Sequence, residues 1–384
     1  MNEMETDYLI VGGGIAGLSA GIALKNLNKT FVVAESTPEA RPAGAGITLA
    51  ANAMEAYAEL GVEDLVRNAG RVLRKVAIED QKGNALNRVD LRKMSKSRYN
   101  LGIHRAALHQ ALLQAVGVEN VLWNKRSKSL KETQAGYTVE FEDGTQIKTK
   151  YLIVAEGIHS KLRTYFLPNS EIRYAGYTCW RGIAQTKTQL ESSEEAVEIW
   201  GSQGRFGYVR VNDEQVYWFA TAKFPQQSKE AAAFTLSDIK QRFSVYPKMV
   251  RELLAQTSEK SLLWNDIIDL KPIPQFAFGK AVLIGDAAHA TTPNMGQGAC
   301  QAIEDALELQ RCLQLNGTVE KQFSEFEKRR KDRSQLIVKR SWSLGKLAES
   351  TSPLVVALRN TVLKLVPEKM NLKQMEQILN QPRF

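Results

Sequence analysis

Three glycines near the start of the chain have the spacing of a phosphate-binding turn. Gly12, Gly14 and Gly17 form a GxGxxG pattern between a short apolar run and a segment with helical periodicity. In such a turn the first glycine permits the sharp bend, the second lets the backbone approach a pyrophosphate, and the third lets the helix pack closely on the strand. The free N–H groups at the start of the helix then face the phosphates.

An acidic residue follows at the distance that a dinucleotide site requires. Glu35 ends the apolar run 30–34 and stands 23 positions after Gly12. A carboxylate in this position is suited to the ribose hydroxyls of an adenosine. The glycines alone are weak evidence, but strand, turn, helix and acid together favour a dinucleotide site over a glycine-rich turn without a ligand. They do not choose between NAD and FAD.

A second polar segment, far along the chain, favours FAD. Gly285 and Asp286 end another apolar run, and Pro293, Gly296 and Gly298 lead into a helix. The Asp286 carboxylate can accept hydrogen bonds from sugar-like hydroxyls. The helix that the glycines open can present N–H groups to an electron-rich ring edge. An NAD domain needs no such distant segment, whereas FAD is long enough to need both.

The order of these motifs resembles the FAD-dependent aromatic hydroxylases, the class A flavoprotein monooxygenases, over nearly the whole chain. Glu156 and Gly157 stand where that family carries an Asp-Gly motif linked to FAD and NAD(P)H, so a glutamate replaces the family aspartate. The resemblance implies further FAD contacts from the first helix, the loop after the second strand and a later helix start. These residues are Ile15, Ala16, Arg41, Gly46 and Arg105.

The resemblance also implies an activity. NADH or NADPH reduces the flavin, the reduced flavin reacts with dioxygen, and the resulting flavin hydroperoxide transfers one oxygen atom to a small planar aromatic or heteroaromatic substrate. The protein binds and orients, because the cofactor performs the chemistry. An epoxidase, a flavin-dependent oxidase or reductase without oxygen insertion, and a flavin-binding protein without turnover are the alternatives. The sequence has no CxxC pair, which argues against a disulfide reductase.

The substrate side is less marked in the sequence, and we assign no catalytic residue. Residues 174–182 resemble a segment of the FAD-dependent urate hydroxylases and of zeaxanthin-epoxidase-like proteins. By that likeness Arg205 and Tyr217 face the substrate, and an arginine fork suits a planar anion. The alternative is an exposed Arg205 and a packed Tyr217. Asn294 stands where we expect an aspartate in the urate enzymes.

These residues require an α/β scaffold. Four short apolar runs predict buried parallel strands, and the first two flank a helix as a βαβ unit. From about residue 171, alternating segments rich in Tyr, Trp, Val and Thr predict an inserted antiparallel sheet. The predicted division is a Rossmann-like FAD-binding domain with a parallel sheet (1–170 and 276–345), an antiparallel substrate domain (171–275) and C-terminal helices (346–384).

Composition is that of an ordinary globular protein, with 384 residues of which 43% are hydrophobic and 24% charged. No apolar stretch is long enough to span a membrane, and the N-terminus has no secretion-signal pattern, so we expect a cytoplasmic protein. The oligomeric state is open, a monomer included. The three cysteines and four histidines are scattered, which predicts no metal site. His289 is expected to be hydrogen-bonded locally.

The net charge of +9 has two interpretations. Much of the excess lies at 328–340 on a helical stretch, which we interpret as a solvated face that helps to attract anionic cofactors rather than as a nucleic-acid site. The apolar helix predicted at 353–366 has two interpretations as well. We expect it to pack on the catalytic body rather than to lie on a membrane surface.

Overall fold

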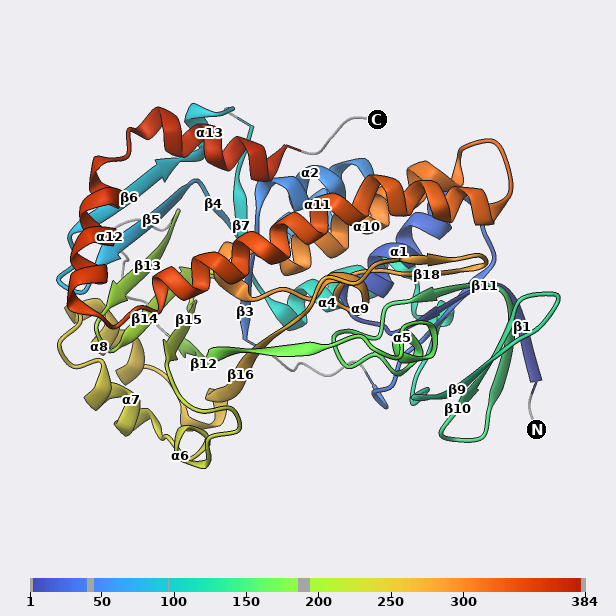
Figure 1. Ribbon diagram of the computed structural model, residues 1–384, viewed down its shortest axis with the longest axis horizontal. Helices are drawn as coiled ribbons and strands as arrows, with labels where there is room; N and C mark the ends of the chain where they lie inside the picture. The colour runs from blue at the N-terminus through green and yellow to red at the C-terminus, as the bar shows by residue number, and fades with distance from the viewer. Residues whose placement is uncertain (1–2, 40–44, 96, 186–193, 381–384) are drawn as a thin grey trace.

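The computed structural model describes residues 3–39, 45–95, 97–185 and 194–380. A mainly parallel sheet stands at one end of the molecule and an antiparallel sheet at the other, and the helix α11 (Val319–Ala348) runs from the first to the second (Figure 1). The predicted fold class, a Rossmann-like domain with a separate antiparallel sheet and C-terminal helices, is confirmed.

The first sheet has the strand order β17-β18-β11-β1-β2-β8, and β10 and β9 extend it from β11. The predicted parallel strands are all present, because β11 and β2 flank β1 and β18 adds to β11, each in parallel. The apolar run that begins at Tyr151 continues an alternating segment before it, and the two form the single strand β11. The strands are β1 (Glu3–Val11), β2 (Phe31–Ala34), β8 (Val121–Leu122), β9 (Ser127–Glu132), β10 (Tyr137–Phe141), β11 (Gln146–Val154), β17 (Ala277–Phe278) and β18 (Ala281–Leu283).

Helices cover the first sheet and complete its core. Nearly all of α1 (Ile15–Asn26) is buried, because the helix lies among the sheet, α4 (Arg105–Val116) and α10 (Gly298–Leu313). A small sheet with the order β3-β7-β4 lies beside them. Its strands, and the shorter helices of this half, are β3 (Gly46–Leu49), β4 (Gly70–Leu73), β7 (Asn100–His104), α2 (Ala51–Glu59), α3 (Glu63–Asn68), α5 (Lys161–Phe166), α9 (Asp286–His289), η1 (Leu91–Lys93), η2 (Val118–Asn120) and η4 (Pro293–Met295).

The second sheet has the order β16-β12-β15-β14-β13-β5-β6. Its last two strands come from residues 75–90, which the sequence placed in the first domain, so that boundary is wrong for this hairpin: β5 pairs in parallel with β13. A hairpin pattern shows which strands pair with each other but not which sheet they join. The strands are β5 (Lys75–Asp80), β6 (Ala85–Asp90), β12 (Ile172–Gln185), β13 (Glu195–Gly201), β14 (Gly204–Arg210), β15 (Gln215–Ala222) and β16 (Leu263–Leu270).

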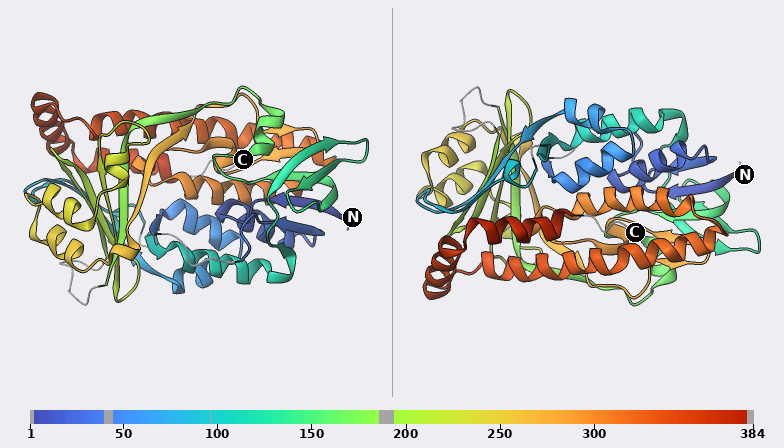
Figure 2. Two further views of the ribbon diagram at one scale, coloured as in Figure 1. Left: turned by 90° about the horizontal axis from the view of Figure 1, so that it is seen from below. Right: turned by 90° about the horizontal axis from the view of Figure 1, so that it is seen from above.

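One face of the second sheet is covered by α6 (Lys229–Ala232), α7 (Leu236–Arg242) and α8 (Lys248–Ala255) (Figure 2). α7 and α8 are separate helices, because Pro247 precedes α8 and a proline does not continue a helix. Trp180, Phe206 and Trp218 pack under these helices. Since side chains alternate along a strand, their neighbours face the other way, toward the first domain.

The chain ends in two helices beyond α11. Both α12 (Pro353–Leu365) and α13 (Glu368–Leu379) pack against β6. α12 contacts β6, and its buried Arg359 donates a hydrogen bond to the Ala348 carbonyl. The apolar face that was expected to pack on the body does not do so, because its large side chains stay exposed: Leu354, Val355, Leu358, Val362 and Leu365. Within the described ranges, no helix combines the length and apolar character needed to cross a membrane. The short η3 (Glu259–Ser261) lies before β16.

Candidate active site

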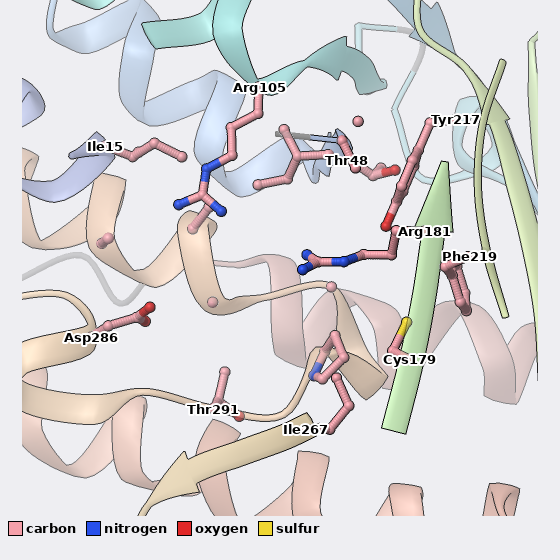
Figure 3. Close-up of a pocket in the computed structure, with 18 of the residues that line it drawn as sticks. Ile15, Thr48, Arg105, Cys179, Arg181, Tyr217, Phe219, Ile267, Asp286 and Thr291 are labelled. Atoms are coloured by element: carbon pink, nitrogen blue, oxygen red, sulfur yellow. The ribbon is translucent and has the colours of Figure 1, made fainter. Parts of the chain in front are cut away.

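A cavity of about 380 Å³ lies between the carboxyl ends of the parallel strands and the inner face of the second sheet (Figure 3). We call the wall made by the first domain the floor and the wall made by β12, β14 and β15 the roof. Of the residues that the sequence predicted, Gly14, Ile15, Ala16, Gly46, Arg105, Gly157, Asp286, Pro293, Gly296 and Gly298 line the floor, and Arg205 and Tyr217 line the roof. Arg41 lies outside the described residues.

The glycine turn between β1 and α1 has the geometry that its spacing predicts. Gly12 has a φ of +109°, and a Cβ there would lie 2.3 Å from the Ala155 carbonyl oxygen. A Cβ on Gly17 would lie 1.8 Å from the Gly12 oxygen. Both positions therefore exclude any side chain. At Gly14 a Cβ would meet nothing within 4 Å, so this part of the turn is open toward the cavity.

Glu35 lies beside the turn, at the end of β2. Its carboxylate accepts hydrogen bonds from the backbone N–H groups of Gly13, at 2.6 Å, and Thr37, at 2.8 Å. These contacts hold the acid next to the glycines, where a ribose would follow the pyrophosphate. Glu35 does not line the cavity itself.

Glu156 is turned away from the cavity. Its carboxylate accepts hydrogen bonds from the Ser127 hydroxyl, the Ser160 hydroxyl at 2.6 Å and the Leu162 N–H at 2.9 Å. The longer side chain at this family position therefore binds its own loop, and the neighbouring Gly157 is the residue that faces the cavity.

Asp286 projects into the cavity at the start of α9. Enclosure by protein raises the pKa of Asp286, and the nearby His289 and Arg105 oppose that rise. Within the described part of the chain, no hydrogen-bond donor reaches this carboxylate. Gly285, just before it, has a φ of +57°, and a Cβ there would lie 2.7 Å from the Ala16 Cβ. The sharp turn thus brings a free acceptor against the start of α1.

The roof is built from alternate residues of two paired strands. Cys179 and Arg181 on β12 face the cavity together with Tyr217 and Phe219 on β15 (Figure 3), and Arg181 is directly opposite Phe219 in the register. Enclosure raises the pKa of the Tyr217 phenol. A Cβ on Gly46 would lie 2.3 Å from the Tyr217 Cβ, so this floor glycine lets the roof approach closely.

Arg205 lines the roof but is bound by the protein's own groups. Its Nε donates to Glu349 at 2.6 Å, its Nη1 to Glu198 at 2.9 Å and its Nη2 to the Asn294 Oδ1 at 2.7 Å. The side chain is 3% exposed, so the alternative of an exposed Arg205 is wrong. The two carboxylates balance its positive charge.

Comparison with known proteins decides the family. Residues 5–341 match the family model described as an FAD binding domain. The chain belongs to the FAD-binding class A monooxygenases. It is therefore an FAD-dependent monooxygenase of aromatic or heteroaromatic substrates, with FAD as its cofactor. The open turn at Gly14 and the unpaired Asp286 carboxylate fit this cofactor.

This monooxygenase is similar over nearly its whole length to three proteins of known name. It is 33% identical to the aurachin C monooxygenase/isomerase of Stigmatella aurantiaca, over 93% of this chain and 94% of that protein. It is 32% identical to the 2-heptyl-3-hydroxy-4(1H)-quinolone synthase of Pseudomonas aeruginosa, over 94% of each. The crystal structure of Klebsiella pneumoniae HpxO complexed with FAD and uric acid matches with a TM-score of 0.90 and 26% identity, over 98% of this chain and 96% of that one.

A buried ionic network, which the sequence did not predict, supports the floor of this monooxygenase. Asp305 accepts hydrogen bonds from the Gly285 N–H at 2.8 Å, from the His289 ring at 2.7 Å and from Arg330 at 2.7 Å. Burial alone would raise the pKa of Asp305, but His289 and Arg330 lower it to about 2. His289 is thus hydrogen-bonded locally, as expected.

Part of the basic run at 328–340 belongs to this network. Arg330 is buried and also pairs with Glu304 at 2.6 Å, and Arg333 contacts the same carboxylate at 2.8 Å. The interpretation of the run as a solvated face is therefore wrong for these two residues. The sequence did contain a signal for this pairing. Glu304 and Asp305, on the helix that begins at Gly298, are adjacent acidic residues that can pair with arginines of the basic run.

Proposed function

We propose that this monooxygenase inserts one atom of dioxygen into a small planar aromatic or heteroaromatic compound. The overall conversion consumes the substrate C–H, dioxygen, NAD(P)H and a proton, and yields C–OH, water and NAD(P)+. The observation that carries the proposal is the joining of two surfaces in one cavity: a glycine floor with a free Asp286, and an aromatic roof formed by Tyr217 and Phe219. When bound, reduced FAD is the group that reacts with dioxygen.

The chain's own residues bind, orient and exclude water. We assign FAD contacts to the floor residues, with Asp286 accepting hydrogen bonds from cofactor hydroxyls and Arg105 supplying positive charge. Gly12, Gly17 and Gly285 shape the backbone beneath the cofactor. The roof encloses the substrate against the flavin side of the cavity.

We also propose the predicted domain limits, near residues 170, 275 and 345, with β5 and β6 assigned to the substrate domain.

The relatives support the shape of the substrate. A quinolone, named for one relative, and uric acid, bound in another, are both planar bicyclic heteroaromatic compounds. We therefore propose a bicyclic heteroaromatic substrate before a single-ring one.

The test is a screen of quinolones, purines and aromatic acids with the purified holoenzyme under labelled dioxygen. We expect at least one compound to stimulate NADH or NADPH oxidation and to gain one labelled oxygen atom, as measured by mass spectrometry. Free FAD with the same compounds is the control. Stimulated oxidation that yields only hydrogen peroxide, with no labelled product from any compound, would contradict oxygen insertion and favour the oxidase alternative.

A further inference from the structure

The roof carries two arginines whose surroundings differ. Arg205 is bound by Glu349, Glu198 and Asn294, and its charge is balanced. Arg181 points into the centre of the cavity (Figure 3). Its Nη2 donates to the amide oxygen of Asn265, which carries no charge.

One donor of Arg181, the Nε, is buried without a hydrogen bond. Across the ranges that the structure describes, no carboxylate forms an ion pair with this side chain. A positive charge without a counter-ion in a partly enclosed cavity costs free energy. A ligand that places a negative oxygen against the accessible side of this guanidinium removes that cost.

We propose that Arg181 binds an acidic oxygen of the substrate, so that the substrate is a planar aromatic or heteroaromatic compound carrying a carboxylate or another ionised oxygen. This inference rests on the proposed function and names the charge of its substrate. The sequence suggested Arg205 on β14 as the residue that binds an anion. The proposal assigns this role to Arg181 on β12 instead.

The surroundings of Arg181 suit such a group. Guanidinium N–H groups match the geometry of a carboxylate and form charge-assisted hydrogen bonds with it. The hydroxyl of Tyr217 lies on the Arg181 side of its ring in Figure 3 and offers a second donor. Phe219, opposite Arg181 in the strand register, provides an apolar surface for the ring that carries the acid.

The test measures binding, not turnover. The oxidised holoenzyme is titrated with benzoate and quinoline-2-carboxylate, and with their neutral counterparts benzamide and quinoline-2-carboxamide, while the visible spectrum of the bound flavin is recorded. We expect Arg181→Gln to raise the dissociation constants of the carboxylates by about 10- to 100-fold and those of the amides by less than about threefold. Arg181→Lys, which keeps the charge but not the fork, should give an intermediate loss.

A matched control separates the local contact from the overall charge. Arg88→Gln removes one positive charge from the same sheet at a side chain that is 52% exposed, and it should leave all four constants unchanged. Three results would overturn the proposal: carboxylate binding unchanged in Arg181→Gln, equal losses for acids and amides, or no response of the wild-type flavin to either acid. Because no NAD(P)H is present, a failure of oxygen insertion leaves this measurement intact, and the two hypotheses can fail separately.

Discussion

The floor and the roof of the cavity are built in different ways. The floor is rich in glycine: Gly14 and Gly157 line it and leave open space, and in the turn beneath it, at Gly12 and Gly17, no side chain fits. The roof is made of side chains, and its two arginines differ in their partners: Arg205 is paired with two carboxylates, whereas Arg181 donates only to the neutral Asn265 among the contacts described. Where the backbone leaves no room for a Cβ, only glycine fits, and a glycine motif in the sequence shows this. The role of a roof side chain instead depends on partners far away in the sequence, which its own position does not show.

The strongest test of this contrast is Gly12→Ala. The added Cβ would lie 2.3 Å from a backbone oxygen at a φ of +109°, so both a clash and backbone strain oppose it. We expect a loss of about 4 kcal/mol in the free energy of unfolding and protein that purifies without flavin colour. Denaturant unfolding and the absorbance of the purified protein measure the two effects.

Gly144→Ala is the control for Gly12→Ala. Gly144 also has a positive φ, +82°, but a Cβ there would meet nothing within 4 Å. It should cost about 1 kcal/mol and leave the flavin content unchanged. Equal effects of the two substitutions would mean that backbone strain alone, and not close approach, fixes the turn.

This contrast also explains how much of the molecule could be predicted from the sequence. The glycine turn, Asp286 and the parallel strands were found because each follows from a local pattern. Residues 75–90, the hairpin β5–β6, were placed in the FAD-binding domain with the rest of 1–170, because their partner strand β13 begins only at residue 195. The state of Arg205 was missed because it depends on Glu349, 144 positions away.

Glu349→Gln tests the balanced half of the roof. Both Glu349 and Arg205 side chains are less than 5% exposed, so removing the carboxylate leaves a buried guanidinium with only one acidic partner, Glu198. We expect a loss of about 3 kcal/mol in the free energy of unfolding, with the flavin content retained. Glu368→Gln, which removes an exposed pair with Lys93, should cost less than about 1 kcal/mol. Similar costs for the two would show that Arg205 does not need its partner.

The network beneath the floor predicts a dependence on pH. The pKa of Asp305 is about 2 in the folded protein, below its ordinary value of 3.8, so its contribution is complete above pH 3.8 and is lost as the pH falls toward 2. We expect this loss to reach about 2 kcal/mol and to be absent in Asp305→Asn, which should be less stable than wild type at neutral pH. Unfolding free energies measured between pH 5 and 2 for both proteins test this. Parallel curves would remove Asp305 as the group that titrates.

The smallest expected effect comes from Asp286, a floor position that acts through its side chain. Asp286→Asn keeps the size of the group but removes the charge that accepts hydrogen bonds from cofactor hydroxyls, so the dissociation constant for FAD should rise about tenfold, as measured by flavin fluorescence during dilution. Asp213→Asn, at a side chain that is 82% exposed, is the control and should match wild type. An unchanged affinity in Asp286→Asn would mean that the charge of Asp286 contributes nothing to FAD binding. In that case the contrast between floor and roof would sharpen, because a second charged side chain of the floor, Arg105, would be left as the only one with an assigned role.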